Sequence, residues 1–217
     1  MKKPSNACGL FIAIEGIDGS GKTVQLKLLQ RYLKQMGLRY RRFKEPTLGR
    51  IGKLLRKALN STWTEHDEHI LALLFAADRH ALYHVRRPCI KESLRQGYVC
   101  IVDRSVLTTL VYQGAKLSER WLLAINHDIP KPDVTIAVDV SLKCALKRLA
   151  GRRRSKQQED YEQTNAVKKY HRRYQTLFKR YRTMFHIHLV DGDATPEVVH
   201  NKIVWVLQDA LQTHHAN

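Results

Sequence analysis

Eight consecutive residues near the N-terminus have the composition and spacing of a phosphate-binding loop. They fit the pattern G-x-x-x-x-G-K-[ST] and are Gly16, Ile17, Asp18, Gly19, Ser20, Gly21, Lys22 and Thr23. Glycines at these positions let backbone N–H groups point inward at a phosphate chain, and the lysine reaches the β- and γ-phosphates of a nucleotide. The Thr23 hydroxyl can ligate Mg²⁺. The alternative is a glycine-rich turn that binds nothing.

The residues on both sides of this loop predict the elements that would position it. An apolar run of strand length lies within residues 10–15, and apolar residues recur at helical spacing over 22–36. A strand that enters a glycine loop and leaves it as a helix places a bound anion at the helix N-terminus, where free N–H groups and the helix dipole attract it. Both flanks therefore favour phosphate binding over a plain turn.

Helical and strand patterns alternate along the rest of the chain, as is typical of an α/β protein with a parallel sheet. We predict strands over 10–15, 39–44, 98–102, 134–138 and 186–190. We predict helices over 22–36, 48–59, 65–86, 141–150, 159–184 and from 196 onward, with another between Pro88 and Gly97 and one after Asp103-Arg104 to about 113. Thr64 is the expected N-cap of the helix over 65–86. No repeat or linker divides the sequence, so we expect one domain over 1–217 with a small lid at about 150–160.

Several polar residues fall where the predicted strands end. Ligands of open α/β sheets bind at the carboxyl ends of the strands, which brings Glu45-Pro46, Asp103-Arg104 and residues 191–193 to the side of the phosphate loop. Asp103 could organise Mg²⁺ directly or through water, or it could cap the following helix. Arg104 could hold a phosphate in a bidentate fork, or it could be a surface arginine.

Two residue pairs with i, i+4 spacing share a helix face and could line one pocket. Phe75 and Arg79 would combine an aromatic plane with a hydrogen-bond fork that reads a base. Their alternatives are a core position for Phe75 and pairing of Arg79 with an acid. Thr108 and Tyr112 form the second pair, for which ordinary helix packing is the simpler interpretation.

A polar segment without apolar periodicity follows at 151–158. On it or beside it lie four arginines: Arg148, Arg152, Arg153 and Arg154. Arginines on a closing lid could stabilise the negative charge of a phosphoryl group in transfer. An exposed basic loop or an RNA contact is the alternative.

The chain is strongly basic, because its 217 residues contain 38 Lys and Arg against 20 Asp and Glu, a net charge of +18. This excess suits a nucleotide but is more than a nucleotide requires, so nucleic acid is a rival partner. Basic clusters lie at 39–42, 152–154 and 168–182. The last is either a nucleic-acid-binding helix or solvated surface charge.

Cysteine and histidine spacing predicts neither disulfides nor a zinc site. The four cysteines form no C-x-x-C pair, and the 11 histidines form no H-E-x-x-H motif. No apolar run approaches the length of a membrane span. We therefore expect free thiols in a reducing compartment, no membrane partner and a cytoplasmic location.

Four sequence strings taken together resemble the thymidylate kinase family of P-loop nucleoside monophosphate kinases. They are E-G-I-D-G-S-G-K-T at 15–23, E-P at 45–46, F-A-A-D-R at 75–79 and D-R-x-x-x-T-x-x-x-Y-Q-G at 103–114. The resemblance covers about residues 9–211. It implies the three-layer P-loop NTPase fold, with a five-stranded parallel sheet, helices on both faces and a lid. It also implies phosphoryl transfer from ATP to dTMP with Mg²⁺, and a homodimer.

The resemblance implies roles at the phosphates. Lys22 and the loop amides would hold the donor phosphates, and Arg104 would hold the acceptor phosphate. Asp18 would approach the deoxyribose 3′-hydroxyl or a metal-bound water. One of the lid arginines would enter the site. The metal ligands would come from Thr23, Asp103 and Glu162.

Further implied roles concern the thymidine part of dTMP. Phe75 would stack on thymine, and Arg79 would donate to a thymine carbonyl. Thr108 and Thr109 would face the base edge, and Tyr112 would crowd a 2′-hydroxyl. Glu45 is the remaining residue implied in the acceptor pocket.

The chain departs from the family pattern beside the acceptor pocket. Lys44 stands where arginine is frequent, and Ser105 stands where an aromatic residue or histidine is common. A kinase for another nucleoside monophosphate is therefore the alternative within enzymes. An ATP-switched nucleic-acid-binding P-loop protein is the alternative from another class.

Overall fold

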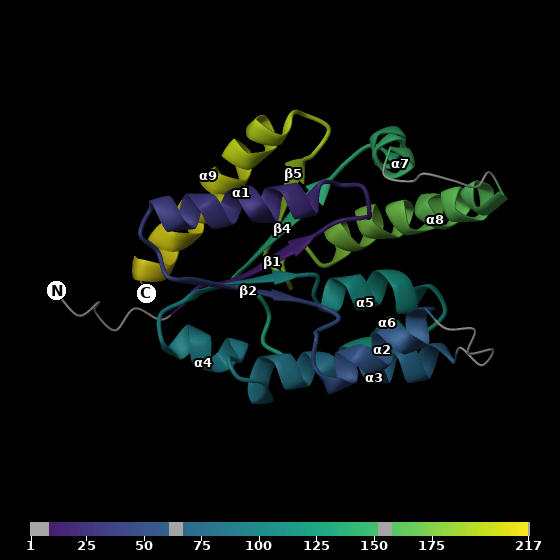
Figure 1. Cartoon of the computed structure of the whole chain (residues 1–217), viewed down its shortest axis with the longest axis horizontal. Coiled ribbons are helices and arrows are strands. Elements are labelled where there is room, and N and C mark those ends of the chain that lie inside the picture. Colours follow the sequence, from purple (N-terminus) through teal and green to yellow (C-terminus); the bar gives the residue numbers. More distant parts are fainter. Residues whose placement is uncertain (1–8, 61–66, 152–157, 217) are drawn as a thin grey trace.

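A five-stranded sheet forms the centre of the computed structural model (Figure 1), which describes residues 9–60, 67–151 and 158–216, apart from the side chains of 60, 158–163 and 214–216. The strand order is β2-β3-β1-β4-β5, and every neighbouring pair is parallel. The strands are β1 (Phe11–Glu15), β2 (Tyr40–Lys44), β3 (Val99–Asp103), β4 (Val134–Asp139) and β5 (Ile187–Asp191).

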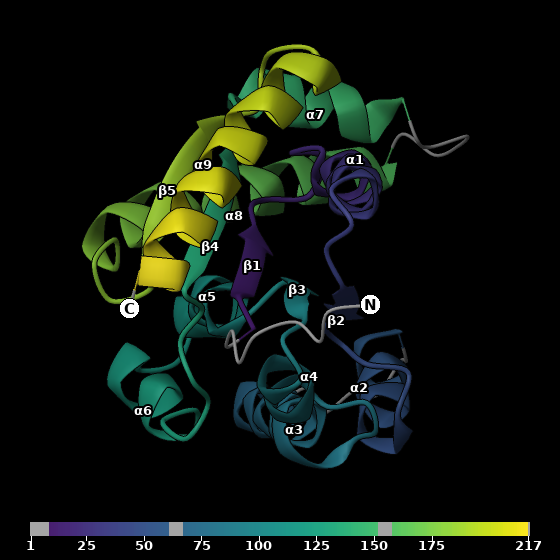
Figure 2. The same ribbon diagram turned by 90° about the vertical axis from the view of Figure 1, so that its left-hand side faces the viewer.

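Helices cover both faces of the sheet, as Figure 2 shows. Within the described residues the α-helices are α1 (Lys22–Gln35), α2 (Arg50–Asn60), α3 (Glu68–His80), α4 (Ile90–Arg95), α5 (Val106–Tyr112), α6 (Glu119–Ala124), α7 (Leu142–Ala150), α8 (Gln158–Arg180) and α9 (Pro196–Ala216). Helices α1 and α9 pack on one face, and α5 and α8 cover the other. This arrangement confirms the predicted P-loop NTPase α/β fold.

Side-chain alternation along β1 explains the two layers. Ile12 and Ile14 point into the core beneath α1 and α9, whereas Phe11 and Ala13 point to the opposite face. Strands β1 and β3 are buried along their whole length, and parallel strands that are covered on both sides read as continuous apolar runs for this reason. Strand β2 lies at the edge of the sheet and is only partly covered.

The structure corrects three predicted helix bounds. Helix α3 begins at Glu68, because Asp67 caps it by accepting a hydrogen bond from the backbone of His69; the predicted cap at Thr64 lies outside the described residues. A π-helix, Ala81–Val85, follows α3 directly. Helix α8 ends at Arg180, four residues before the predicted end. The sequence patterns also missed α6, whose six residues give too short a period to detect.

The described cysteines, Cys89, Cys100 and Cys144, carry free thiols. None of the helices in the described part of the chain is long and apolar enough to cross a membrane.

Candidate active site

The phosphate loop depends on glycine where the backbone is left-handed and tightly packed. Gly16 has a φ of 141°, and a Cβ there would lie 2.5 Å from the carbonyl oxygen of Val138. Gly21 has a φ of 97° and forms the N-cap of α1. Side chains disfavour both conformations. The loop is therefore held against β4 with the N-terminus of α1 facing its concave side.

Lys22 folds over this loop. Its Nζ donates to the carbonyl oxygens of Gly16 and Ile17 at 2.5 and 2.8 Å. Burial, followed by the nearby charge of Arg104, lowers the pKa of Lys22 to about 8. An anion bound beside Lys22 would stabilise the ammonium and raise this pKa again.

The phosphate loop and the end of β3 line one small cleft of about 90 Å³. Its walls include Lys22 and Thr23 from the loop and the Asp103-Arg104 pair. Arg104 Nη2 donates to Asp18 Oδ1 at 2.5 Å. The sheet thus brings together the two motifs that are about 80 residues apart in sequence.

The Arg104 backbone is left-handed, with a φ of 77°, a conformation that costs a non-glycine residue about 1–3 kcal/mol and must be held by its surroundings. Its amide donates to Ile14 O. The next residue, Ser105, donates both its backbone N–H and its hydroxyl to Glu15 Oε1 at 2.7 Å. Hydrogen bonds to Ile14 and Glu15 therefore hold the strained turn that directs Arg104 into the cleft.

Glu15 is a fully buried carboxylate that sequence reasoning did not identify as a site residue. Besides Ser105, it accepts from the hydroxyl of Thr108 at 2.8 Å and from that of Tyr174 at 3.3 Å. It thereby joins β1, α5 and α8. The hydroxyl of Thr108 is engaged in this network, which favours the packing interpretation of that residue.

Arg79 and Glu45 form a buried pair beside the cleft. Arg79 Nε lies 3.0 Å from both carboxylate oxygens, and Nη2 lies 2.6 Å from Oε2. The guanidinium also donates to Thr109 Oγ1 at 3.1 Å and to Asn126 Oδ1 at 2.6 Å. Burial raises the pKa of Glu45, and the charge of Arg79 opposes this rise. Arg79 is therefore paired with an acid, as the alternative interpretation of the sequence predicted.

A second contact fixes the segment that follows Glu45. The amide and hydroxyl of Thr47 both donate to Asp78 at 2.6 Å. Asp78 precedes Arg79 on α3, so one helix turn holds both the segment and the guanidinium.

The aromatic residues predicted near the acceptor lie on two sides of this region. Phe75 is half-buried and packs against the α2–α3 cluster. Tyr112 packs against Tyr170 with the rings tilted by 41° and their centroids 4.4 Å apart, and it meets Tyr174 edge-on. The Arg104 guanidinium lies 5.7 Å from the Tyr112 ring centroid. Burial raises the pKa of Tyr112 to about 12, so its phenol stays neutral.

A separate pocket of about 340 Å³ opens on the other side of the phosphate loop, between α1, α7 and the start of α9. Arg148 lies in its wall and donates to Ser20 O at 3.2 Å and to Gly192 O at 2.9 Å. Buried polar atoms without a partner among the described residues also occur here, namely Ser20 Oγ and Gln25 Oε1.

The predicted residues Arg152, Arg153 and Arg154 lie outside the described residues, as does the side chain of Glu162. Sequence patterns missed Glu15, Asn126 and Tyr174 because each acts through contacts with distant segments. The only signal for Glu15 was an acid at the end of an apolar strand.

The loop, the strand-end pair and the parallel sheet define a P-loop nucleotide-binding protein. A family model described as "Thymidylate kinase" matches residues 14–203. A "Probable thymidylate kinase" of Thermococcus onnurineus (strain NA1) is 36% identical over 212 residues, which are 93% of this chain and 98% of the relative. A "Probable thymidylate kinase" of Pyrococcus abyssi (strain GE5 / Orsay) is 35% identical over 94% and 98%. A "Putative thymidylate kinase" of Treponema pallidum (strain Nichols) is 33% identical over 92% and 95%. The chain belongs to the thymidylate kinase family.

Proposed function

We propose that this chain transfers the γ-phosphoryl group of ATP to dTMP and releases ADP and dTDP. The observation that carries this proposal is the cleft in which Lys22 and Arg104 meet, next to the buried Arg79. In this proposal Lys22 would hold the donor phosphates, Arg104 the acceptor phosphate, and Arg79 would read the base. Membership of the thymidylate kinase family supports the same reaction.

We assign the adenine end of ATP to the pocket beside Arg148. The amide oxygen of Gln25, which has no hydrogen-bond partner among the described residues, would accept from the exocyclic amine of adenine. From this pocket the phosphates would run over the loop amides and Lys22 toward Arg104. The helix dipole of α1 adds to their attraction.

The acceptor base would meet Arg79. A guanidinium carries five N–H groups, and in the described contacts those of Nε and Nη2 serve Glu45, Thr109 and the carbonyl oxygen of Ser105. Nη1 uses one N–H for Asn126, so its second remains for a thymine carbonyl. Phe75 would stack on the ring, and Tyr112 would lie under the sugar.

Catalysis would come from positioning and electrostatics, because the attacking oxygen of a phosphate monoester is already largely ionised at pH 7. Thr23 and Asp103 present hard oxygen ligands in the same cleft, a donor set that suits Mg²⁺. Bound Mg²⁺ would neutralise phosphate charge. Arg104 would hold the acceptor phosphate, and arginines 152–154 would complete the site as part of a lid over about 150–160, within a single domain.

We further propose a homodimer in the cytoplasm. Helices α2 and α3 pack together and expose apolar side chains, among them Leu54, Ile70 and Leu73, which are 43%, 50% and 49% exposed. Such a patch fits an interface between two copies. The free thiols fit a reducing compartment.

The experiment that tests the reaction measures ADP release with ATP, Mg²⁺ and a panel of acceptors: dTMP, dUMP, dCMP, dGMP, dAMP, UMP and AMP. We expect turnover to be dominated by dTMP and weak with UMP. Equal rates with all acceptors would retain the phosphate site but remove the proposed thymine pocket. Preference for another nucleoside monophosphate would reassign the substrate.

A further inference from the structure

Most of the positive excess of this chain comes from two segments. Residues 24–57 and 86–95 contain 15 Lys and Arg but only two acids, Glu45 and Glu92, which gives +13 of the total +18. Glu45 is buried against Arg79 and neutralises no surface charge. The charge is therefore local, and a nucleotide site of a few residues does not account for it.

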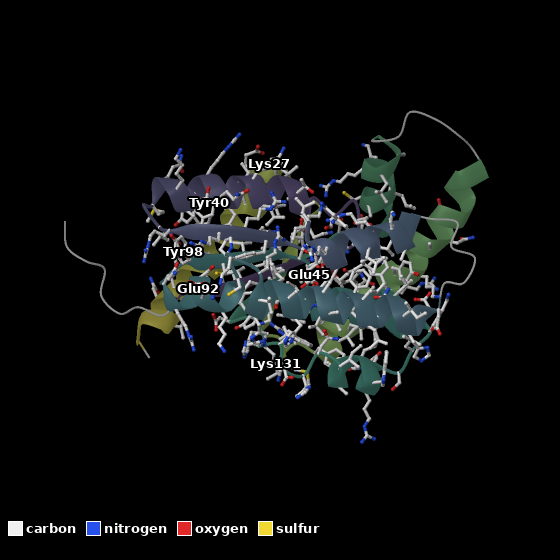
Figure 3. The ribbon with its side chains drawn as sticks, turned by 60° about the horizontal axis from the view of Figure 1, so that its bottom comes forward. Lys27, Tyr40, Glu45, Glu92, Tyr98 and Lys131 are labelled. Carbon is white, nitrogen blue, oxygen red and sulfur yellow. The ribbon has the colours of Figure 1, made fainter. Side chains whose placement is uncertain are left out.

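The fold gathers these two segments around edge strand β2. They form α1, β2 and α2 and the region from the end of the π-helix through α4. Figure 3 looks onto this side, where Lys27, Tyr40, Tyr98 and Glu92 follow one another. Twelve of the 15 cations are exposed. In the described part of the chain, their ion pairs with acids are Arg42–Asp103 and Arg87–Glu92.

A groove runs beside β2 and is lined by four of the cations. Arg42, Lys44, Arg56 and Arg86 border it, and its volume is about 530 Å³. Pro46, Leu48 and Pro88 complete part of its wall. Cations around a recess concentrate positive potential within it.

At the other end of β2, two guanidiniums are held in place by one ring. Arg39 and Arg41 lie over Tyr98, with 4.9 and 4.1 Å between each guanidinium carbon and the ring centroid. Arg39 also donates to Gln96 O at 2.5 Å, and Arg41 donates to Ser93 Oγ at 2.9 Å. Their charges are thus fixed at the surface before any ligand arrives.

We propose that this β2 face, defined as the 15 cations of residues 24–57 and 86–95, binds the phosphate backbone of a nucleic acid. The five residues of β2 span about 17 Å, which matches about five phosphates of a helically stacked strand at about 3.4 Å of helix axis each. A sugar-phosphate chain can enter the groove, whereas a flat bilayer cannot. The basic helix α8 is a poorer candidate, because its Arg173 and Arg180 pair with Glu119.

The test is fluorescence anisotropy with a labelled deoxyadenosine oligomer of about 20 nucleotides, which has no thymine and no terminal phosphate. We expect binding at about 100 mM salt that persists with saturating ADP and dTMP. The triple variant R39E/R86E/K91E should bind at least about tenfold more weakly. Its log–log salt slope should be smaller by about 2, since each phosphate contact on a single strand contributes about 0.7.

The matched control is R172E/K179E/R182E, which makes the same charge change at exposed positions on and just after α8. It should lose less than about threefold in affinity, and both variants should keep wild-type kinase rates and unfolding temperatures. The proposal is overturned if the wild-type chain does not bind at about 100 mM salt, if ADP and dTMP displace the oligomer, or if the control loses as much affinity. Tighter binding to phosphatidylserine vesicles than to the oligomer, with the same sensitivity to the variants, would assign the face to a membrane instead.

Discussion

Arg79 and Glu45 form a buried ion pair beside the proposed acceptor pocket, with Nη2 and Oε2 2.6 Å apart and both side chains almost fully covered. Glu45 follows edge strand β2, and Arg79 lies near the end of α3. Their contact therefore fixes α3 to the carboxyl edge of the sheet. Thr109 and Asn126 accept further hydrogen bonds from the guanidinium, which makes it rigid.

We predict that Arg79→Ala lowers kcat/KM for dTMP by at least about 100-fold while KM for ATP changes little. The guanidinium provides the proposed contact with the thymine carbonyl, and a site built for a hydrogen bond loses much when it is removed. Steady-state kinetics with each substrate varied in turn measure both effects.

The same substitution leaves Glu45 buried without its partner, which costs about 3–5 kcal/mol of stability. The double variant E45A/R79A removes the stranded charge. It should recover part of the unfolding temperature but none of the activity with dTMP. Recovery of that activity would contradict the base-reading role of Arg79.

The depressed pKa of Lys22, about 8, predicts a pH dependence of ATP use. The cationic form is the one that holds phosphates, and its fraction in the free enzyme falls from about nine-tenths at pH 7 to about one-tenth at pH 9. We expect kcat/KM for ATP to fall above pH 8, because this parameter reports the free enzyme. A pH profile measures it, and a flat profile up to pH 10 would contradict it.

Lys22 should also make folding more favourable as pH rises from about 8 toward 10.5, its ordinary value. Over that range the unfolded chain holds a proton that the folded chain has lost. Lys22→Arg is the control for both effects, since guanidinium stays charged throughout. In this variant kcat/KM for ATP should not fall above pH 8 as it does in the wild-type enzyme.

Glu15→Gln should lower the free energy of unfolding and also kcat. Ser105 donates to one carboxylate oxygen of Glu15, and Thr108 and Tyr174 donate to the other. The amide of glutamine keeps the shape of the side chain but has only one acceptor oxygen, so at least one of these donors loses its partner. Each unsatisfied buried partner costs about 1–3 kcal/mol. Denaturant unfolding and steady-state kinetics measure the two effects.

Ser105→Ala separates the positioning role of Glu15 from general stability. It removes one of the hydrogen bonds to Glu15 and leaves the carboxylate in place. If Glu15 acts by aiming Arg104, KM for dTMP should rise in this variant by a larger factor than KM for ATP. Equal changes in both would indicate a structural role alone.

Tyr112→Ala should weaken discrimination against ribonucleotides. Tyr112 is held by the rings of Tyr170 and Tyr174, so it cannot easily move away from a 2′-hydroxyl. We expect the ratio of kcat/KM for dUMP to that for UMP to fall at least about fivefold. Tyr112→Phe keeps the ring and should retain the ratio; a loss there would point to the phenol oxygen instead.

Leu73→Glu should convert the proposed dimer to a monomer, because it places a charge in the exposed apolar patch of α2 and α3 that includes Leu54 and Ile70. Light scattering coupled to gel filtration measures the mass. Leu189→Glu is the control, since Leu189 is comparably exposed but lies on β5. A wild-type monomer, or an effect of equal size in the control, would contradict an α2–α3 interface.

The sequence by itself determined the phosphate-loop motif and the class of fold. A phosphate loop is a local object, because eight consecutive residues supply both its turn and its ligating groups. The central strands could also be predicted from the sequence, since burial on both faces makes β1 and β3 continuous apolar runs. These features depend on spacing along the chain alone.

Only the tertiary structure decided which polar residues from distant parts of the sequence pair with one another. Arg79 could have been free or paired, and the choice of Glu45 follows from where β2 places its end against α3. No local pattern predicts that Glu15 contacts Ser105 or that Asn126 contacts Arg79, since these partners lie tens of residues away and meet only in the folded chain. The concentration of positive charge on one face likewise follows from the position of β2 at the sheet edge, because strand order is set by packing rather than by sequence order.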